Sequence, residues 1–295
     1  MSVIAIFGPT ASGKSAVAEE IAGRLPGEVV SADSMQVYRG LPILTNQDRH
    51  AHLVGIWPLE HEASVGEYAE LAHAAIDGIL EAGRTPIVVG GTGLYLRAAL
   101  ANLEIPPVPP PGLRERLERL YDDKGGERAL ATLAERDPAA AAAVHANDRR
   151  RVVRALELAE LGSSLRRTDS KLWTAETRHP TVVFGLDLPT DELHRRIERR
   201  ARAIFDLGVE DEVREALSGP ISATARHVFG LREVAELSRE EAVGALVAMT
   251  RRYAAYQRKW MRRIPEIVIV DANRPAAETA DEMLTLAATP AARHA

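Results

Sequence analysis

The sequence predicts an α/β fold with a parallel, doubly wound sheet as its core and an all-helical insertion. Short apolar runs alternate with longer amphipathic segments up to about residue 100 and return at residue 181, and this order is typical of a parallel sheet. A stiff proline-rich stretch at residues 105–111 precedes a segment with helical periodicity and no strand candidate. We therefore place the core at residues 1–106 and 176–295, and the insertion at residues 107–175.

Each predicted strand of the first block is a short apolar run, and each predicted helix has apolar residues at helical spacing. The strands are predicted at residues 3–7, 28–31, 53–57 and 86–89, and the helices at residues 14–25, at 64–82 and from Gly93 onward. The helix at 64–82 has one apolar face and should end at Gly83, because glycine readily adopts the left-handed conformation that closes a helix.

The remaining elements follow the same logic. Residues 113–165 are predicted to be helical, with Asn147 or Asp148 as the N-cap of a helix over 150–161. Strands are predicted at 181–186 and 266–270, and helices at 191–207, 209–217 and 240–263.

Composition excludes several classes of protein. The chain has 295 residues, 46% of them hydrophobic, which is enough for a sizeable core. It has no cysteine, so disulfides, cysteine-based zinc sites and cysteine nucleophiles are excluded. The N-terminus does not resemble a signal peptide, and no apolar run approaches the roughly 20 residues of a membrane span. We expect a cytoplasmic monomer.

The formal net charge of −5 argues against a nucleic-acid-binding protein, but binding requires only a local basic face. Arginine and lysine gather in three clusters, at residues 149–154, 195–202 and 251–263. Each cluster is either a basic binding face or a solvated helix face balanced by nearby glutamates.

A phosphate-binding loop is the strongest motif. Residues 8–15 fit the pattern G-x-x-x-x-G-K-[ST] between an apolar run and a predicted helix. In such a loop backbone N–H groups and the helix N-terminus hold phosphate oxygens, the lysine adds a positive charge, and the serine hydroxyl can bind Mg²⁺. The core is therefore expected to be P-loop NTPase-like. The loop residues expected to hold phosphate are Gly8, Thr10, Ala11, Ser12, Gly13, Lys14 and Ser15, with Ser15 as the metal ligand.

An acid is expected next to this loop. ATPases usually end a neighbouring strand in a metal-supporting aspartate, whereas the strand at 86–89 ends in Gly90-Gly91-Thr92. Asp33 instead follows the second strand, and carboxyl ends of parallel strands meet at one edge. Asp33 is thus a candidate general base or metal partner; the alternative is that it only caps a turn.

The chain resembles the tRNA dimethylallyltransferase (isopentenyltransferase) family. Three segments carry most of the resemblance: Gly-Pro-Thr-Ala-Ser-Gly-Lys-Ser at 8–15, Asp-Ser-Met-Gln-Val-Tyr at 33–38 and Gly-Gly-Thr-Gly-Leu-Tyr at 90–95. Weaker matches follow in the expected order at residues 137–157, 196–200, 208–213 and 250–260, so the resemblance covers most of the chain. The chain departs from the family pattern at residues 41–47, 51–55 and 230–233, outside the phosphate loop.

The resemblance implies transfer of a dimethylallyl group from dimethylallyl diphosphate to N6 of the adenosine at position 37 of tRNA, next to the anticodon. It implies Asp33 as the base that deprotonates the adenine amine, Thr10 and Arg200 as residues that stabilise the departing diphosphate, and Mg²⁺ as cofactor. The residues it implies for binding the tRNA anticodon stem-loop are Asp33, Ser34, Met35, Gln36, Thr92, Arg114, Arg150, Arg151 and Arg154.

Three alternatives remain open from the sequence. A small-molecule P-loop kinase would use ATP and activate a hydroxyl with Asp33, but it leaves the arginine-rich insertion unexplained. An isopentenyltransferase acting on free adenine nucleotides would share Asp33 and the loop. A non-catalytic, nucleotide-gated RNA-binding protein would have no need of a carboxylate near RNA phosphates.

Overall fold

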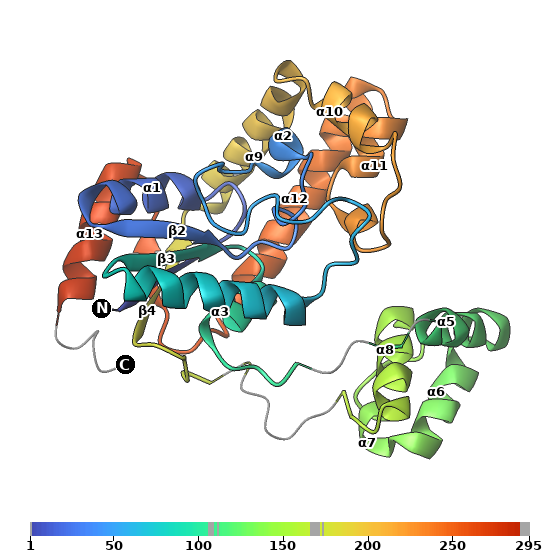
Figure 1. Cartoon of the computed structure of the whole chain (residues 1–295). Coiled ribbons are helices and arrows are strands. Elements are labelled where there is room, and N and C mark those ends of the chain that lie inside the picture. The colour runs from blue at the N-terminus through green and yellow to red at the C-terminus, as the bar shows by residue number, and fades with distance from the viewer. Residues whose placement is uncertain (1, 106–108, 111, 166–171, 173, 290–295) are drawn as a thin grey trace. The chain divides into compact units, whose positions relative to one another are not determined.

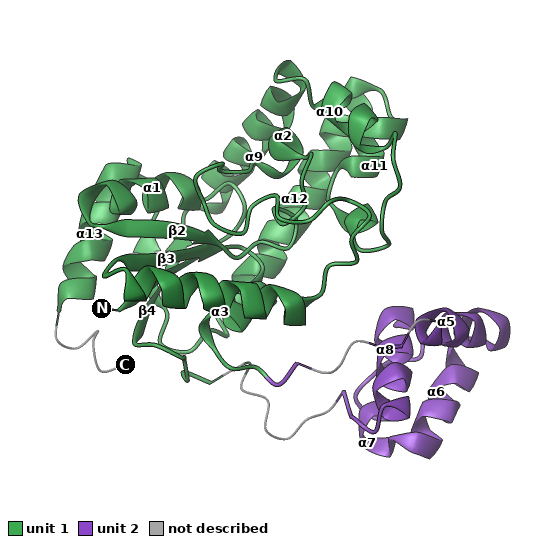
Figure 2. Cartoon of the chain, in the orientation of Figure 1, with its two compact units in different colours: residues 1–103, 172–295 green, residues 104–171 purple. Residues whose placement is uncertain are grey.

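The computed structural model describes residues 2–105, 109–110, 112–165, 172 and 174–289. The chain divides into two compact units (Figure 2). Unit 1 comprises Met1–Leu103 and Leu172–Ala295, and unit 2 comprises Glu104–Lys171. The predicted insertion, residues 107–175, overlaps unit 2, and its proline-rich start lies partly outside the described residues.

Unit 1 is built on a five-stranded sheet in the order β2-β3-β1-β4-β5, and every neighbouring pair is parallel (Figure 1). The strands are β1 (Val3–Phe7), β2 (Gly27–Ser31), β3 (Thr85–Gly90), β4 (Thr181–Asp187) and β5 (Val268–Asp271). Because β2, β3 and β1 lie side by side, the loops that follow them leave the same edge of the sheet.

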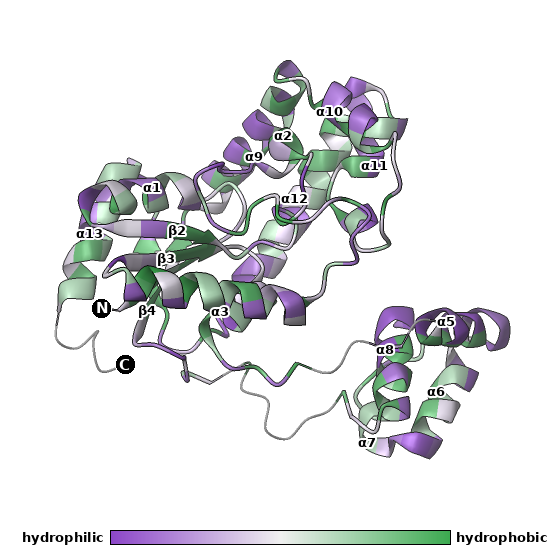
Figure 3. Cartoon of the chain, in the orientation of Figure 1, coloured by the Kyte–Doolittle hydropathy of each residue, from purple (hydrophilic) through white to green (hydrophobic). Residues whose placement is uncertain are grey.

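Helices cover both faces of this sheet. On one face α1 (Lys14–Arg24) and α13 (Ala276–Ala288) pack against alternate strand residues such as Ile6, Ile87 and Phe184. Helices α3 (Val65–Glu81) and α4 (Gly93–Leu100) contact each other and the same sheet through β1, β2 and β3. In Figure 3 the arrowhead end of β2 is coloured hydrophobic, and the last two residues of this edge strand are buried.

A second group of helices follows β4. It consists of α9 (Thr190–Asp206), α10 (Val209–Ala216), the 3-10 turn η2 (Ala225–His227), α11 (Leu231–Glu236) and α12 (Arg239–Met261), and the short α2 (Pro42–Thr45) contacts α10. Helix α9 packs on α12 through Leu193, Ile197 and Ala254, and Ala11 of the phosphate loop joins this cluster. The packing thereby brings α9 and α12 to the phosphate loop.

Unit 2 contains only helices among its described residues. They are α5 (Leu113–Lys124), α6 (Gly126–Arg136), the short α7 (Pro138–Ala141) and α8 (Arg149–Glu160). Leu117, Leu133 and Leu156 belong to its separate apolar core. Asp148 is the N-cap of α8, since its carboxylate accepts a hydrogen bond from the Arg151 amide at 3.1 Å.

The predicted α/β fold with a parallel sheet is confirmed, but one strand is wrong. Residues 53–57 do not extend the sheet; they form a loop with isolated bridges Val30–His52 and Tyr38–Trp57. Leu53 has φ of 64° and Gly55 has φ of 58°, and two left-handed residues so close together cannot belong to a regular strand. The helices α2, α11 and α13 were not predicted. None of the described helices is long and apolar enough to cross a membrane.

Candidate functional site

The phosphate loop connects β1 to α1, as the motif requires. Gly13 is the N-cap of α1 with φ of 93°, and Ala11 has φ of 65°, a conformation that is strained for a residue with a side chain. The Ser12 amide donates to the Pro9 carbonyl at 3.2 Å and closes the turn. A side chain at Gly8 would approach the Leu186 carbonyl to 2.7 Å, so the loop begins where only glycine fits.

The side chain of Lys14 folds back onto the start of this loop. Its Nζ donates to the carbonyls of Gly8 at 2.9 Å and Pro9 at 2.8 Å. Burial lowers the pKa of Lys14 to about 8, the nearby Asp33 carboxylate opposes that change, and the Arg200 guanidinium adds to it. The lysine is therefore a half-buried charge that lacks full compensation, and an anion bound in the loop would supply it.

Asp33 lies in the loop after β2, beside this lysine. Its Oδ1 accepts a hydrogen bond from the Met35 amide at 2.9 Å, so one carboxylate oxygen is held and the side chain is half-buried. Three tyrosines, Tyr68, Tyr95 and Tyr253, experience its charge: burial raises the pKa of each hydroxyl, and the Asp33 carboxylate contributes to the increase. These phenols therefore stay protonated, and the Asp33 carboxylate also raises the pKa of Lys14 and of Arg200.

Arg200 approaches the phosphate loop from α9. Its Nη1 lies 3.5 Å from Oγ1 of Thr10, which is the limit of a hydrogen bond. Burial lowers the pKa of Arg200, and Asp33 opposes this change. The structure thus brings together Thr10, Lys14, Asp33 and Arg200, which are far apart in the sequence.

Gln257 of α12 joins two loops of the site. Its Oε1 accepts from the Thr10 amide at 2.7 Å, and its Nε2 donates to the Gly91 carbonyl at 2.8 Å. The side chain is buried, with 2% exposed. A Cβ at Gly91 would lie 2.1 Å from Nε2 of Gln257, so glycine at this position is what allows the connection.

Thr92 connects the glycine-rich loop after β3 to the Asp33 loop. Its Oγ1 accepts from the Ser34 amide at 3.3 Å and lies 3.3 Å from the hydroxyls of both Ser34 and Tyr253. A Cβ at Gly93 would lie 2.1 Å from the Trp260 ring, so α4 begins in close contact with α12. Thr92 therefore stands where three segments meet.

Gln36 is predicted to recognise the adenosine, but its side chain is engaged within the chain. Nε2 donates to the carbonyls of Thr45 at 3.1 Å and Asn46 at 2.7 Å, and Oε1 accepts from Oγ of Ser31 at 2.8 Å. Both amide hydrogens are in use, so this geometry suits a residue that shapes the loop. Adenosine recognition by Gln36 stays a prediction.

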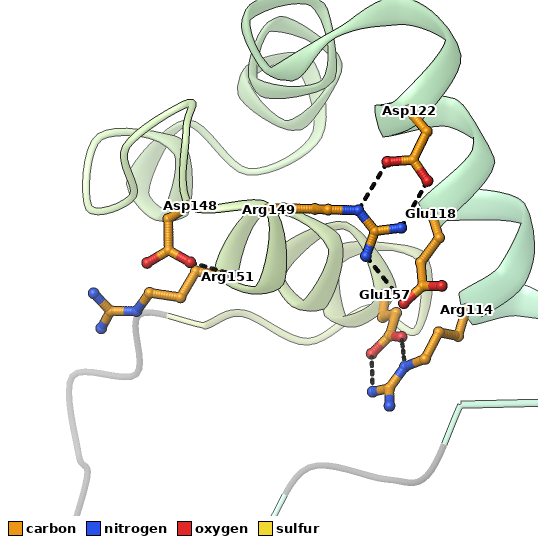
Figure 4. Close-up of polar contacts among 7 residues, drawn as sticks. All are labelled: Arg114, Glu118, Asp122, Asp148, Arg149, Arg151 and Glu157. Atoms are coloured by element: carbon orange, nitrogen blue, oxygen red, sulfur yellow. Dashed lines mark hydrogen bonds and ion pairs between the residues drawn. The ribbon is translucent and has the colours of Figure 1, made fainter. Parts of the chain in front are cut away.

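Two of the predicted RNA-binding arginines of unit 2 are paired with one carboxylate. Arg114 binds both oxygens of Glu157, at 2.6 and 3.1 Å, and Arg154 binds its Oε2 at 2.8 Å (Figure 4 shows the first pair). Glu157 is fully buried, and its pKa is lowered: burial opposes this change but is outweighed by hydrogen bonds from the two arginines. Arg114 and Arg154 are thus partly neutralised before any ligand binds.

The arginines in the first turn of α8 differ in whether they are paired with an acid. Arg149 is paired with Asp122 at 2.7 Å and with Glu118 at 3.5 Å. Among the described residues, the exposed side chains of Arg150 and Arg151 form no ion pair, and Figure 4 shows Arg151 directed away from the acids of α5. Arg150 and Arg151 are the predicted residues best placed to bind backbone phosphates.

Four residues of the site were not selected from the sequence: Tyr68, Tyr95, Tyr253 and Gln257. Tyr95, Tyr253 and Gln257 lie within segments that resemble the family, which was the available signal. Tyr68 lies on the predicted apolar face of α3, where only the three-dimensional contact, a hydrogen bond of 2.8 Å from its hydroxyl to the Ser31 carbonyl, distinguishes it from a core residue.

A parallel sheet with a phosphate loop at its carboxyl edge, the Asp33 carboxylate and an arginine from a separate helix define a P-loop enzyme of the group-transfer class. The comparisons specify it further. The family model described as IPP transferase matches residues 36–264, and the one described as isopentenyl transferase matches residues 1–56. The chain belongs to the IPP transferase family, and the predicted family membership is confirmed.

Individual relatives agree over nearly the whole chain. The tRNA dimethylallyltransferase of Corynebacterium jeikeium is 40% identical over 286 residues, covering 92% of both chains. That of Anaeromyxobacter dehalogenans is 43% identical over 280 residues, covering 89% of this chain and 90% of the relative. The crystal structure of the tRNA isopentenylpyrophosphate transferase of Bacillus halodurans is 32% identical, with a TM-score of 0.68 and coverage of 97% and 95%. A eukaryotic dimethylallyltransferase acting on tRNA, 24% identical with a TM-score of 0.78, shares the fold.

Proposed function

We propose that this chain transfers a dimethylallyl group from dimethylallyl diphosphate to N6 of the adenosine 3′-adjacent to the anticodon of tRNA. The observation that carries the proposal is the grouping of Asp33 with Lys14 and Arg200 at the phosphate loop. One carboxylate beside two cations suits a reaction in which an amine loses a proton while an anionic leaving group departs. The names of the relatives, which are tRNA dimethylallyltransferases, support the same reaction.

The proposed reaction forms a bond between the adenine N6 and the allylic carbon and breaks the bond between that carbon and the diphosphate oxygen. The N6 proton passes to Asp33, whose second oxygen is not used by the Met35 amide. Negative charge grows on the leaving oxygen, and Arg200, Thr10 and the loop N–H groups stabilise it electrostatically. Diphosphate leaves with the electron pair of the broken bond.

The donor set around the loop fits Mg²⁺. The described residues contain no group of three or more histidines and acids that could hold a metal by themselves. Mg²⁺ is commonly held by one or two protein oxygens, with phosphates and water completing its shell. We propose that Ser15 supplies the hydroxyl ligand, and the bound ion would neutralise part of the diphosphate charge.

The helical unit supplies the RNA-binding part of the proposal. An adenine next to the anticodon must leave the stacked loop to reach the half-buried Asp33 carboxylate. We propose that Arg150 and Arg151, with Arg114 and Arg154 held by Glu157, bind the phosphates of the anticodon stem-loop. We propose that the enzyme works in the cytoplasm, where its proposed tRNA substrate would be met, and that it works as a monomer.

The direct test is transfer from labelled dimethylallyl diphosphate, with Mg²⁺, to unmodified tRNA and separately to AMP. Nucleosides of the digested product are identified by mass spectrometry. Label on adenosine of tRNA and none on AMP is the expected result. Label on AMP would favour a free-nucleotide enzyme, and no label on either acceptor would remove the proposal and direct attention to ATP-dependent phosphorylation.

Affinity for a diphosphate is expected to fall as the pH rises above about 8, because Lys14 then loses its proton. The affinity should fall by at most about tenfold per pH unit. The fall stops at the pH at which Lys14 loses its proton in the anion-bound state as well. The linked effect on stability has the opposite sign. The folded-state pKa of Lys14 lies below its unfolded value of 10.5, so the unfolded chain binds more protons between pH 8 and 10.5, and the contribution of Lys14 to the free energy of unfolding rises with pH in that window.

Calorimetric titration with inorganic pyrophosphate across this range measures the effect. The Lys14→Arg variant is the matched control, because its side chain stays protonated and its curve contains only the ionisation of pyrophosphate. Parallel pH profiles for the two proteins would show that Lys14 does not titrate where we expect.

Loss of Arg150 and Arg151 is expected to weaken tRNA binding and to flatten its dependence on salt. Each phosphate contact contributes a slope of about 0.7–0.9 in log Kd against log salt, so the double alanine variant should lose about 1.5. The matched control is Arg149→Ala on the same turn, because Asp122 and Glu118 already neutralise that side chain. An unchanged slope in the double variant, or an equal change in the control, would show that Arg150 and Arg151 lie on a solvated helix face and do not bind tRNA phosphates.

A further inference from the structure

The short helix α2 is capped by a carboxylate from a distant part of the chain. The amides of Ile43 and Leu44 donate to Oε2 and Oε1 of Glu212 at 2.7 and 2.8 Å. Pro42 has no N–H, and the N-cap residue Leu41 provides no side-chain bond. Glu212, on α10, is therefore the sole side chain that caps the start of α2 among the described residues.

The other end of α2 supports the loop that carries Asp33. The carbonyls of Thr45 and Asn46 accept both hydrogens of the Gln36 side-chain amide. The same side chain accepts from Oγ of Ser31, the last residue of β2, at 2.8 Å. Residues 32–35, which we call the arch, are thus a short loop whose flanking residues Ser31 and Gln36 are hydrogen-bonded to each other.

These contacts form a continuous path from α10 to the proposed base. Glu212 fixes the amides of α2, the carbonyls of α2 fix Gln36, and Gln36 closes the arch that holds Asp33. We infer that Glu212 is a positioning residue for the Asp33 loop: through α2 and Gln36 it sets where the base stands relative to the adenine amine. This role rests on the proposed function, in which Asp33 is the general base, and it adds a residue that positions that base.

Two features separate this role from general support of the fold. Glu212 is half-buried and binds only two backbone amides, and it has no contact with the phosphate loop among the described interactions. The phosphate loop is held by other contacts: Gln257 accepts the Thr10 amide, and the Ser12 amide donates to the Pro9 carbonyl. A displaced α2 should therefore affect the acceptor step and leave diphosphate binding intact. Burial raises the pKa of Glu212, which agrees with a carboxylate removed from water to make these bonds.

The test compares Glu212→Ala and Glu212→Gln with Glu210→Ala, an exposed acid on the same helix. We expect kcat/KM for tRNA to fall about tenfold or more in Glu212→Ala, with the KM for dimethylallyl diphosphate and the Kd for pyrophosphate within about twofold of the parent. Glu212→Gln keeps one acceptor oxygen and should recover part of the loss. Glu210→Ala should behave as the parent.

Unchanged tRNA kinetics in Glu212→Ala, or a parallel loss of pyrophosphate binding, would overturn the inference. If the alanine variant does not fold, the nearly isosteric Glu212→Gln carries the test. Hydrogen exchange gives a readout independent of activity: amides of Met35, Ile43 and Leu44 should exchange faster in the variants, while those of residues 8–15 should not. That readout still decides the inference if the parent protein transfers no label and the proposed function itself fails.

Discussion

Replacement of Asp33 by asparagine is expected to lower kcat for dimethylallyl transfer by roughly 10²–10⁴-fold, the range typical of a lost general base. Asparagine keeps the size of the side chain and an oxygen that can accept the Met35 amide, so the shape of the loop should survive. An amide oxygen cannot accept the N6 proton at neutral pH. The variant should therefore bind its ligands and fail at the chemical step.

Removal of this charge also acts on its neighbours in a predictable direction. Asp33 raises the pKa of both Lys14 and Arg200 against the effect of burial, and it repels any anion in the loop. Because an anion bound in the loop favours the protonated form of Lys14, loss of the repulsion is expected to dominate near pH 7. Pyrophosphate binding by Asp33→Asn should thus be retained or tighter, which a simple loss of folding would not produce.

Single-turnover transfer to tRNA and calorimetric titration with pyrophosphate measure the two quantities separately. Asp48→Asn is a matched control, because Asp48 accepts the amide of His50 at 2.9 Å in the same local geometry that Asp33 has with Met35. The control should transfer at the parental rate. If Asp33→Asn kept more than about a tenth of the parental rate, Asp33 would not be the base.

The elements that the sequence predicted correctly are those determined by local pattern. The strand before the phosphate loop is a continuous apolar run, and α3 behind Ser64 and α8 behind Asp148 each combine helical periodicity with a capping residue. The sequence also placed Asp33 near the loop, because parallel strands share a carboxyl edge. These inferences need no knowledge of distant contacts.

The errors arise where distant contacts decide. Residues 53–57 are apolar enough for a strand, but the chain meets the edge strand β2 only in the isolated bridge Val30–His52, and the left-handed Leu53 and Gly55 break the run. Helix α2 exists because Glu212, 168 or more residues away, caps it. Gln257 stood in a recognised segment, yet nothing in that segment indicates that one amide joins two loops.

The arginines show the same limit. From spacing alone Arg150 and Arg154 form one basic face, as residues four apart on a helix do. In the structure Arg154 is paired with a carboxylate and Arg150 is not. The partner is the buried Glu157, which also binds Arg114 and which the sequence showed only as part of a segment that resembles the family. Spacing predicts which side chains share a face, but it cannot predict which of them are already neutralised.

Replacement of Arg200 by alanine is expected to lower kcat by about 10²–10³-fold, the usual cost of removing one preorganised group that stabilises charge in a transition state. The guanidinium lies at Thr10 and experiences the Asp33 charge, so it is positioned where the leaving diphosphate would become more negative. An interaction that strengthens as the bond breaks affects kcat more than the KM for the donor. Arg200→Lys should recover part of the rate, since it restores a charge without the planar fork.

Arg202→Ala is the control, because that exposed side chain lies on the same helix and pairs with Glu198. Pre-steady-state transfer, with donor binding measured separately, distinguishes the outcomes. A variant of Arg200 that lost donor affinity and kept kcat would make the arginine a ground-state ligand of the diphosphate. A loss of kcat alone, together with the loss in Asp33→Asn, would mean that the two charges act on opposite ends of one reaction: the carboxylate on the proton that leaves the amine, and the arginine on the charge that leaves with the diphosphate.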